Sequence, residues 1–199
     1  MADIKVFGRW STEGIKVEDP GLIDYIALTP ALIPRSGARY AGKRFHKSKV
    51  FIVERFINKL MVPGHRGKKH MITSYRTSGR SQTAQKLVET AFGIIEKRTK
   101  KNPVEVFVKA VENASPREEI IAIEYGGAVY PKAIECSPQR RIDLALRYFV
   151  QGSFQSAFNK KKKQVDALAD EIVNAYHTSS ASAAIAKKLE LERQADASR

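Results

Sequence analysis

Apolar residues recur along most of the chain at spacings of three and four positions, the pattern of one buried face on an α-helix. The clearest case includes Val165, Leu168 and Ile172. Two of the expected helices begin with a proline directly after an N-cap residue, Asn102 or Ser137. The pattern predicts six helices, over about residues 50–61, 82–98, 103–114, 138–150, 165–176 and 183–196.

Alternation with a period of two, the pattern of a strand, is clear in only one place. Residues 119–125 and 128–136 flank Gly126-Gly127, a pair suited to the tight turn of a β-hairpin. Because an isolated hairpin is marginally stable in water, it is expected to lean on helices at its base or on a partner at its tip. The predicted fold class is therefore mainly α, a bundle of about six helices with one β-hairpin.

The N-terminal residues show neither period. Glycines and prolines interrupt residues 1–34, and the segment from Arg35 to Lys49 has almost no apolar residues besides Tyr40 and Phe45. We therefore expect an extended N-terminal arm over residues 1–49, basic from residue 35, with Trp10 as a hydrophobic anchor. A helical domain should follow over residues 50–199.

The stretch from Arg35 to Arg80 carries nearly all of the excess positive charge. It contains thirteen lysines and arginines and a single acid, Glu54, in a chain whose formal net charge is +14. This concentration predicts binding to a polyanion, first of all to the phosphates of a nucleic acid. The aromatic rings of Tyr40 and Phe45, which lie among these cations, can stack on bases. The candidate phosphate-binding residues here are Arg35, Arg39, Lys43, Arg44, Lys47, Lys49, Arg66, Lys68, Lys69, Arg76 and Arg80.

More cations stand at the starts of two predicted helices. Arg140 and Arg141 lie in the first turn after the cap Ser137, where the helix dipole disfavours positive charge. Lys160 and Lys161 open a run of four lysines ahead of the fifth helix. Because residues that work against local stability are candidates for function, we add these four cations to the predicted nucleic-acid contacts.

Other classes of function find little support. Residues 37–43 match the first seven positions of a phosphate-binding P-loop, but the eighth, which must be Ser or Thr, is Arg44. The single Cys136 and the four histidines lack the spacing of a zinc site, so we expect no catalytic residue, metal or cofactor. The apolar runs are too short to cross a membrane and the N-terminus has no signal-peptide core, which predicts a cytoplasmic protein.

A DNA-binding architectural protein would need similar charge. Its recognition helix should carry Arg, Asn or Gln on one exposed face. Here the cations lie mostly in the arm, the loops and the helix starts, which suits a folded RNA recognised by its shape. The residues alone therefore predict a nucleic-acid binder, with RNA only slightly favoured over DNA.

The order of the motifs resembles the universal small-subunit ribosomal protein S-seven family, called the fifth small-subunit protein in eukaryotic nomenclature. A helix ends in a basic loop containing Gly67-Lys68-Lys69, and a later helix ends in Ser-Pro-Arg117. The Gly126-Gly127 hairpin then runs into Ser-Pro-Gln-Arg140-Arg141. The N-terminal Asp-Ile-Lys-Val-Phe-Gly-Arg-Trp is similar to the archaeal and eukaryotic branch, and the missing long acidic extension favours the archaeal form.

The resemblance implies a structural protein without enzymatic activity, with a hairpin that protrudes from the helices. It implies early binding to the 3′ major domain of small-subunit ribosomal RNA (rRNA) and a role in assembling the subunit head. The rRNA contacts that it implies are Arg39, Lys43, Arg44, Lys68, Lys69, Arg117, Arg140 and Arg141.

The same resemblance implies a position for the hairpin. Its tip, Tyr125, Gly126, Gly127 and Ala128, should lie near the exit-site tRNA and the mRNA exit path. The ninth and eleventh small-subunit proteins would be neighbours. Glu124 stands where relatives often have arginine, which leaves steric guidance or a protein contact as the role of the tip.

Overall fold

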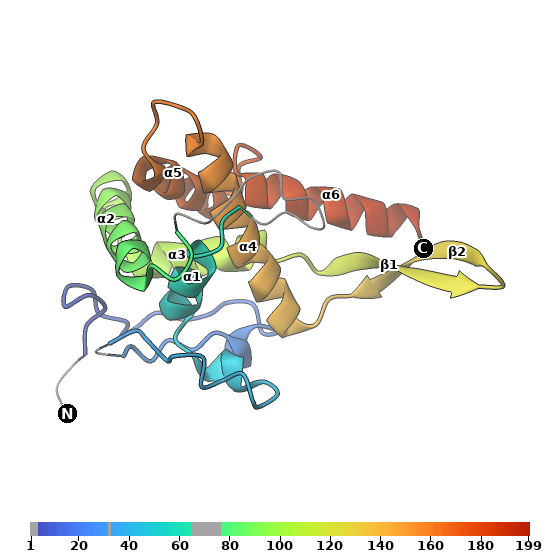
Figure 1. Ribbon diagram of the computed structural model, residues 1–199, viewed down its shortest axis with the longest axis horizontal. Coiled ribbons are helices and arrows are strands. Elements are labelled where there is room, and N and C mark those ends of the chain that lie inside the picture. Colours follow the sequence, from blue (N-terminus) through green and yellow to red (C-terminus); the bar gives the residue numbers. More distant parts are fainter. Residues whose placement is uncertain (1–3, 32, 65–76) are drawn as a thin grey trace.

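The computed structural model describes residues 4–31, 33–64 and 77–199 and confirms the mainly helical fold (Figure 1). Six α-helices lie within these residues: α1 (Ile52–Leu60), α2 (Ser81–Thr99), α3 (Pro103–Ala114), α4 (Pro138–Ala157), α5 (Gln164–Tyr176) and α6 (Ala183–Ala197). The described strands are β1 (Glu118–Tyr125) and β2 (Ala128–Glu135). Two short 3-10 helices, η1 (Ile23–Tyr25) and η2 (His46–Lys49), precede α1.

Helix α5 lies at the centre of the bundle and packs against α2, α3 and α4. Its predicted apolar face is confirmed, since Leu168 and Ile172 are fully buried. Around it, the ring of Phe107 lies 4.8 Å from that of Phe56 and 5.7 Å from that of Phe92, measured between centroids. These aromatic contacts join α1, α2 and α3 into one core.

Helix α4 continues to Ala157, well past Val150, the last apolar position of the predicted helix. Beyond Val150, the start of α6 lies against α4 at Gly152, which is buried. A Cβ atom on Gly152 would lie 2.7 Å from the Cβ of Ala183 and 3.2 Å from the carboxyl carbon of Glu171. Glycine at this position therefore permits the close approach of the two helices.

Replacing Gly152 by Ala is expected to lower the free energy of unfolding by about 1–3 kcal/mol, because the added methyl group overpacks the contact between α4 and α6. Gly93→Ala in α2 is a matched control, since a Cβ atom there would meet nothing within 4 Å. That change should stabilise the protein by about 0.5–1 kcal/mol through helix propensity. Urea unfolding of both variants measures the difference, and two changes of the same sign would contradict the close contact.

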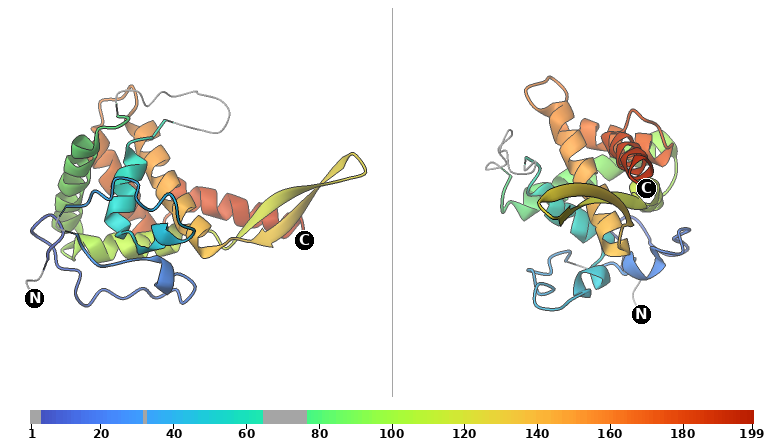
Figure 2. Two further views of the ribbon diagram at one scale, coloured as in Figure 1. Left: turned by 60° about the horizontal axis from the view of Figure 1, so that its bottom comes forward. Right: turned by 90° about the vertical axis from the view of Figure 1, so that its right-hand side faces the viewer.

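The hairpin projects from the helical body beside α6 (Figure 2). The strands pair in register from Glu118 opposite Glu135 to Tyr125 opposite Ala128. Gly126 and Gly127 have φ angles of 59° and 80°, the left-handed conformation that a two-residue primed turn requires. The predicted hairpin and its turn are thus confirmed, and they lean on α6 at the base.

The N-terminal segment is packed more closely than the predicted extended arm. Val6, Trp10, Leu22 and Ile26 are buried in the same core as the helices. Trp10, predicted as an anchor, packs edge to face on Phe92 with 5.9 Å between ring centroids. The prediction of an arm rested on missing periodicity, but isolated large side chains can be buried from irregular backbone. The term arm therefore describes the backbone of this segment and not its packing.

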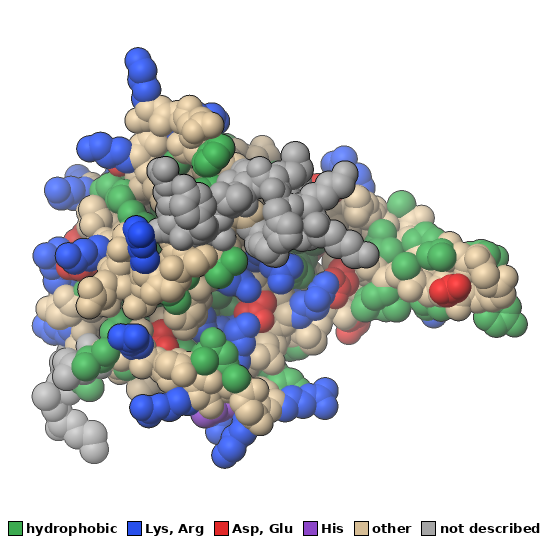
Figure 3. Space-filling model, viewed as in Figure 1, with side chains coloured by type: hydrophobic (Ala, Val, Ile, Leu, Met, Phe, Trp, Pro, Cys, Tyr) green, Lys and Arg blue, Asp and Glu red, His purple; other side chains and the backbone are tan. Residues whose placement is uncertain are grey.

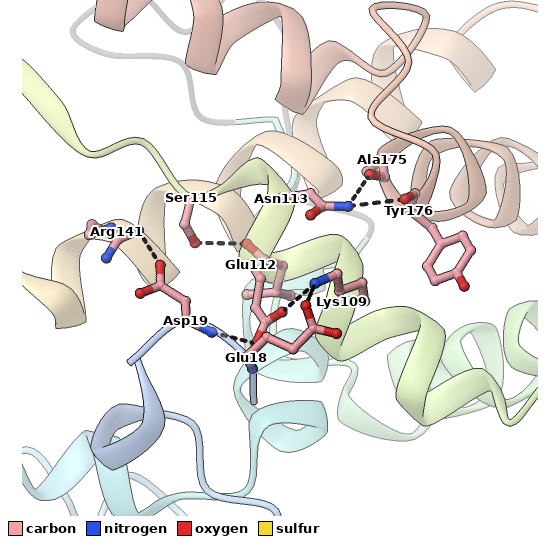
Figure 4. A network of polar contacts seen from close by, with 10 residues as sticks. Glu18, Asp19, Lys109, Glu112, Asn113, Ser115, Arg141, Ala175 and Tyr176 are labelled. Atoms are coloured by element: carbon pink, nitrogen blue, oxygen red, sulfur yellow. Dashed lines mark hydrogen bonds and ion pairs between the residues drawn. The ribbon is translucent and has the colours of Figure 1, made fainter. Parts of the chain in front are cut away.

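Polar contacts on α3 hold the same segment in place (Figure 4). The carboxylate of Glu112, itself buried, accepts a hydrogen bond of 2.7 Å from the backbone N–H of Glu18. Lys109 forms ion pairs with both Glu18 and Glu112. Glu112 lies on the interior side of α3 and would cost stability if unpaired, so these contacts fix residues 18–19 against α3.

Candidate nucleic-acid interface

Most of the predicted phosphate-binding side chains that the structure describes are exposed. The exposed ones are Arg35, Arg39, Lys43, Arg44, Lys49, Arg80, Arg117, Arg140, Lys160 and Lys161, and Lys47 is half-buried. Arg66, Lys68, Lys69 and Arg76 lie outside the described residues. Lys and Arg side chains gather over the helical body in Figure 3, whereas hydrophobic side chains dominate the hairpin. We call the surface of residues 35–49, α1, α4 and the α4–α5 loop the basic face.

Residues 35–49 are held at both ends, while all of their lysines and arginines except Lys47 are exposed. At the start, the backbone N–H of Ser36 donates a 2.6 Å hydrogen bond to Glu54, and at the end the Lys47 ammonium lies 2.6 Å from Asp143. Glu54 is the single acid of the basic stretch, and it is buried. It therefore anchors the segment and does not neutralise the exposed cations. No helix begins at Lys43, which removes the remaining support for a P-loop.

Helix α4 links the two ends of the basic face. It has 20 residues and is therefore about 30 Å long, with Arg140 in its first turn and Lys160 and Lys161 just beyond its last. Within the described part of the chain, neither Lys160 nor Lys161 forms an ion pair, whereas Lys162 pairs with Asp170. The two exposed lysines are available to a phosphate of a partner.

The two arginines at the start of α4 differ in exposure and in their partners. Arg140 is exposed and pairs with Glu119 of β1 at 2.5 Å. Arg141 is only 8% exposed. Its Nη2 lies 2.6 Å from Oδ2 of Asp19 (Figure 4), and its Nε donates to the backbone carbonyl of Pro116 at 3.1 Å. Arg141 thus ties the N-terminal segment to α4 in the free protein, because its side chain points inward, whereas the side chain of Arg140 is exposed.

The internal ion pair with Arg141 affects the pKa of the Asp19 carboxyl group. Burial raises its pKa, but the hydrogen bond from Arg141, the backbone hydrogen bond from Gly21 and the charges of Arg141 and Arg117 together outweigh burial, so the net shift of the pKa is downward. A folded-state pKa below the unfolded value stabilises the protein above the unfolded pKa, and the contribution is lost as the pH falls through the folded-state pKa.

A second group of charges lies at the centre of the basic face, and the sequence predicts only one of its cations, Lys47, as a contact. Lys47, Arg55, Lys59 and Arg147 surround one carboxylate, Asp143. Arg55 is 4% exposed and its Nη2 lies 3.2 Å from Oδ1 of Asp143. Burial raises the pKa of Asp143, but the hydrogen bond and charge of Lys47 and the charge of Arg55 lower it further, so the carboxyl is ionised at neutral pH.

A signal for this group is present in the sequence. Arg55 and Lys59 are four residues apart in α1, and Asp143 and Arg147 are four apart in α4. Such spacing places each pair on one side of its helix. What the pattern does not provide is the crossing of the two helices that brings both pairs together.

The hairpin differs in character from the basic face. Its strands contain Glu118, Glu119, Glu124 and Glu135 but only one cation, Lys132. Tyr125 at the predicted tip is 81% exposed, and Gly126, Gly127 and Ala128 beside it are also exposed. Because the hairpin is acidic and apolar, it is a poor phosphate-binding element, and the phosphate contacts are expected on the helical body.

The described residues contain no cluster of three or more His, Cys, Asp or Glu side chains that would hold a metal ion. Burial raises the pKa of the Cys136 thiol to about 12, so the thiol stays protonated at neutral pH. In the same part of the chain, no helix has the length and apolar character to cross a bilayer.

Comparison with known proteins agrees with the motifs. Residues 24–199 match the model of a family described as ribosomal protein S7p/S5e. The chain is 55% identical over 196 residues to the small ribosomal subunit protein uS7 of Nanoarchaeum equitans, covering 98% of this chain and 99% of the relative. It is 47% identical over 188 residues to uS7 of Methanothermobacter thermautotrophicus, with coverage of 94% and 95%. It is 43% identical over 197 residues to uS7 of Archaeoglobus fulgidus, with coverage of 99% and 96%.

Proposed function

The chain belongs to the ribosomal protein S7p/S5e family, and from this membership we propose that it binds the 3′ major domain of small-subunit rRNA through its basic face. It is a small-subunit ribosomal protein of the archaeal type, a structural constituent of the cytoplasmic ribosome, and its family is one of ribosomal proteins and not of enzymes. The alternative, a non-ribosomal DNA- or RNA-binding architectural protein, has no comparable support.

One observation carries the proposal for the basic face. The exposed lysines and arginines of residues 35–49 and of the α4–α5 loop stand at opposite ends of α4, and the acid of the basic stretch, Glu54, is withdrawn into the interior. A surface about 30 Å long with cations at both ends can contact several phosphates of a folded RNA at once. Binding of this kind orders distant RNA segments against each other, which is the physical basis of a role in assembling the subunit head.

The hairpin supports a different part of the proposal. Its exposed apolar residues, including Tyr125, Val129 and Tyr130, and its excess of acids suit contacts with proteins or steric guidance of RNA more than a grip on phosphates. In the assembled subunit we propose that the tip lies near the mRNA and the exit-site tRNA. The ninth and eleventh small-subunit proteins would be its protein neighbours.

Binding to rRNA fragments tests the proposed function. At one fixed salt concentration, affinity for a transcript of the 3′ major domain should exceed that for a 5′-domain transcript of equal length by at least about tenfold, because specific complexes are tighter than purely electrostatic ones. Filter binding measures both affinities. Equal affinities would indicate a binder of any polyanion and would remove the support for specific rRNA recognition.

A further inference from the structure

A pocket opens in the middle of the basic face, between α1, α4 and the start of α6. Its volume is about 910 Å³, within the range of about 300–1,000 Å³ that is usual for pockets that hold small ligands. Of the described residues that the sequence predicts as RNA contacts, Lys47 alone lines it. The pocket is therefore a separate feature in the centre of the proposed interface.

The pocket carries positive charge that the protein does not neutralise. Asp143 on its wall already pairs with Lys47 and Arg55. Lys59 and Arg147 also line the pocket, and in the described ranges neither of them forms an ion pair. An anion of the partner would find two cations in place.

The position of Lys59 disfavours the charged form of its ammonium group in the free protein. The side chain is half-buried, and burial lowers its pKa. The charge of Asp143 raises this pKa, but the charges of Arg147, Lys47 and Arg55 lower it again. A lysine held among like charges in a partly dry site does not stabilise the fold, and such positions are where function is expected.

The other side chains of the pocket suit a nucleobase. Tyr40 from residues 35–49 and Tyr148 from α4 bring aromatic rings to the wall, and both are half-buried. Asn58 and Gln155 add amide groups, each of which can donate and accept hydrogen bonds. Aromatic rings, amides and cations together are the chemistry by which proteins hold unpaired RNA nucleotides. An acidic peptide would use the cations but leave both rings without a partner.

We propose that this pocket receives one unpaired nucleotide of the rRNA, with its phosphate bound by Lys59 and Arg147 and its base stacked on Tyr40. The amides of Asn58 and Gln155 contact the edge of the base. The inference rests on the proposed function, because it assigns a specific nucleotide site within the same interface.

The test uses the full chain and a transcript of the 3′ major domain. The variants are Lys59→Gln and Tyr40→Leu, with Lys86→Gln as the matched control, since Lys86 is an exposed cation of α2 and does not line the pocket. Filter binding gives each affinity, and acylation of the RNA 2′-hydroxyl groups reports the reactivity of every unpaired nucleotide. Thermal unfolding of the free variants shows whether the fold is intact.

We expect each pocket variant to weaken binding about tenfold, which is the size of effect typical of losing one charged hydrogen bond or one stacking contact. Both should expose the same unpaired nucleotide to modification while the rest of the footprint stays. Lys86→Gln should change affinity less than twofold, and Lys59→Gln should not lower the unfolding temperature. Wild-type affinity and footprint in both pocket variants would overturn the inference. Failure of the wild-type chain to bind the transcript would instead overturn the proposed function, and the inference with it.

Discussion

Raising the salt concentration from 50 to 200 mM is expected to weaken binding to the 3′ major domain by on the order of 10³-fold. A protein that neutralises about six phosphates releases a comparable number of counterions, and affinity then falls steeply with salt. The described part of the chain has ten exposed cations among the predicted contacts, so six simultaneous phosphate contacts require only part of them. Titrations at four or more salt concentrations give the slope of log affinity against log salt.

A charge-neutralised variant locates the source of this slope. Replacing Arg35, Arg39, Lys43 and Arg44 together by Gln should lower the slope by about three, since each phosphate contact contributes roughly 0.7–0.9. Lys132→Gln on the hairpin is the control and should leave the slope unchanged. A shallow slope for the wild-type chain, or a larger effect of Lys132 than of the four arm residues, would contradict phosphate binding on the basic face.

Replacing Trp10 by Ala is expected to lower the free energy of unfolding by about 3–5 kcal/mol, the usual cost of removing a buried aromatic side chain. Trp10 is 6% exposed, and it packs edge to face on Phe7 and Phe92 at centroid distances of 6.2 and 5.9 Å. The cavity would lie between the N-terminal segment and α2. Chemical unfolding followed by circular dichroism measures the change.

A second readout distinguishes a packed segment from a loose arm. Limited proteolysis of the free wild-type chain should spare residues 4–28 and cut first within residues 33–45, where most side chains are exposed. Trp10→Ala should make residues 4–28 sensitive as well. Ile33→Ala is the matched control, because Ile33 is 73% exposed and its loss should change stability by less than about 0.5 kcal/mol. Equal effects of the two substitutions would show that the N-terminal segment is not part of the core.

The helices and the hairpin could be predicted from the sequence because both depend on local patterns. The N-cap of α3 is an example, since Asn102 accepts a 3.0 Å hydrogen bond from the backbone N–H of Val104. Gly126 and Gly127 mark the turn of the hairpin because they tolerate positive φ angles. The packing of residues 4–28 could not be predicted in this way. It depends on the burial of Trp10, Leu22 and Ile26 in the core formed by the helices. Such contacts between distant residues produce no periodic pattern of apolar residues in the sequence.

In the candidate site, too, the features that depend on neighbouring residues could be predicted, and those that depend on contacts between distant residues could not. Local charge density was sufficient to mark residues 35–49, whose cations are mostly exposed. The sequence could not separate Arg140 from Arg141, because inward and outward positions in the first turn of α4 depend on where Asp19 and Glu119 lie. Lys59 and Arg147 were missed for a related reason. In the sequence each has the spacing of an ordinary surface cation. Only the crossing of α1 and α4 brings both into one pocket, where the acids are too few to pair with all of the cations.

Protection of individual lysines from acylation tests the central claim most directly. The free chain and its complex with the 3′ major domain are treated with an amine-reactive reagent, and mass spectrometry quantifies the modification of each lysine. Binding through the basic face predicts strong protection of Lys43, Lys49, Lys160 and Lys161 and little change at Lys132 on the hairpin. Protection at Lys132 without protection at the other four lysines would contradict the account.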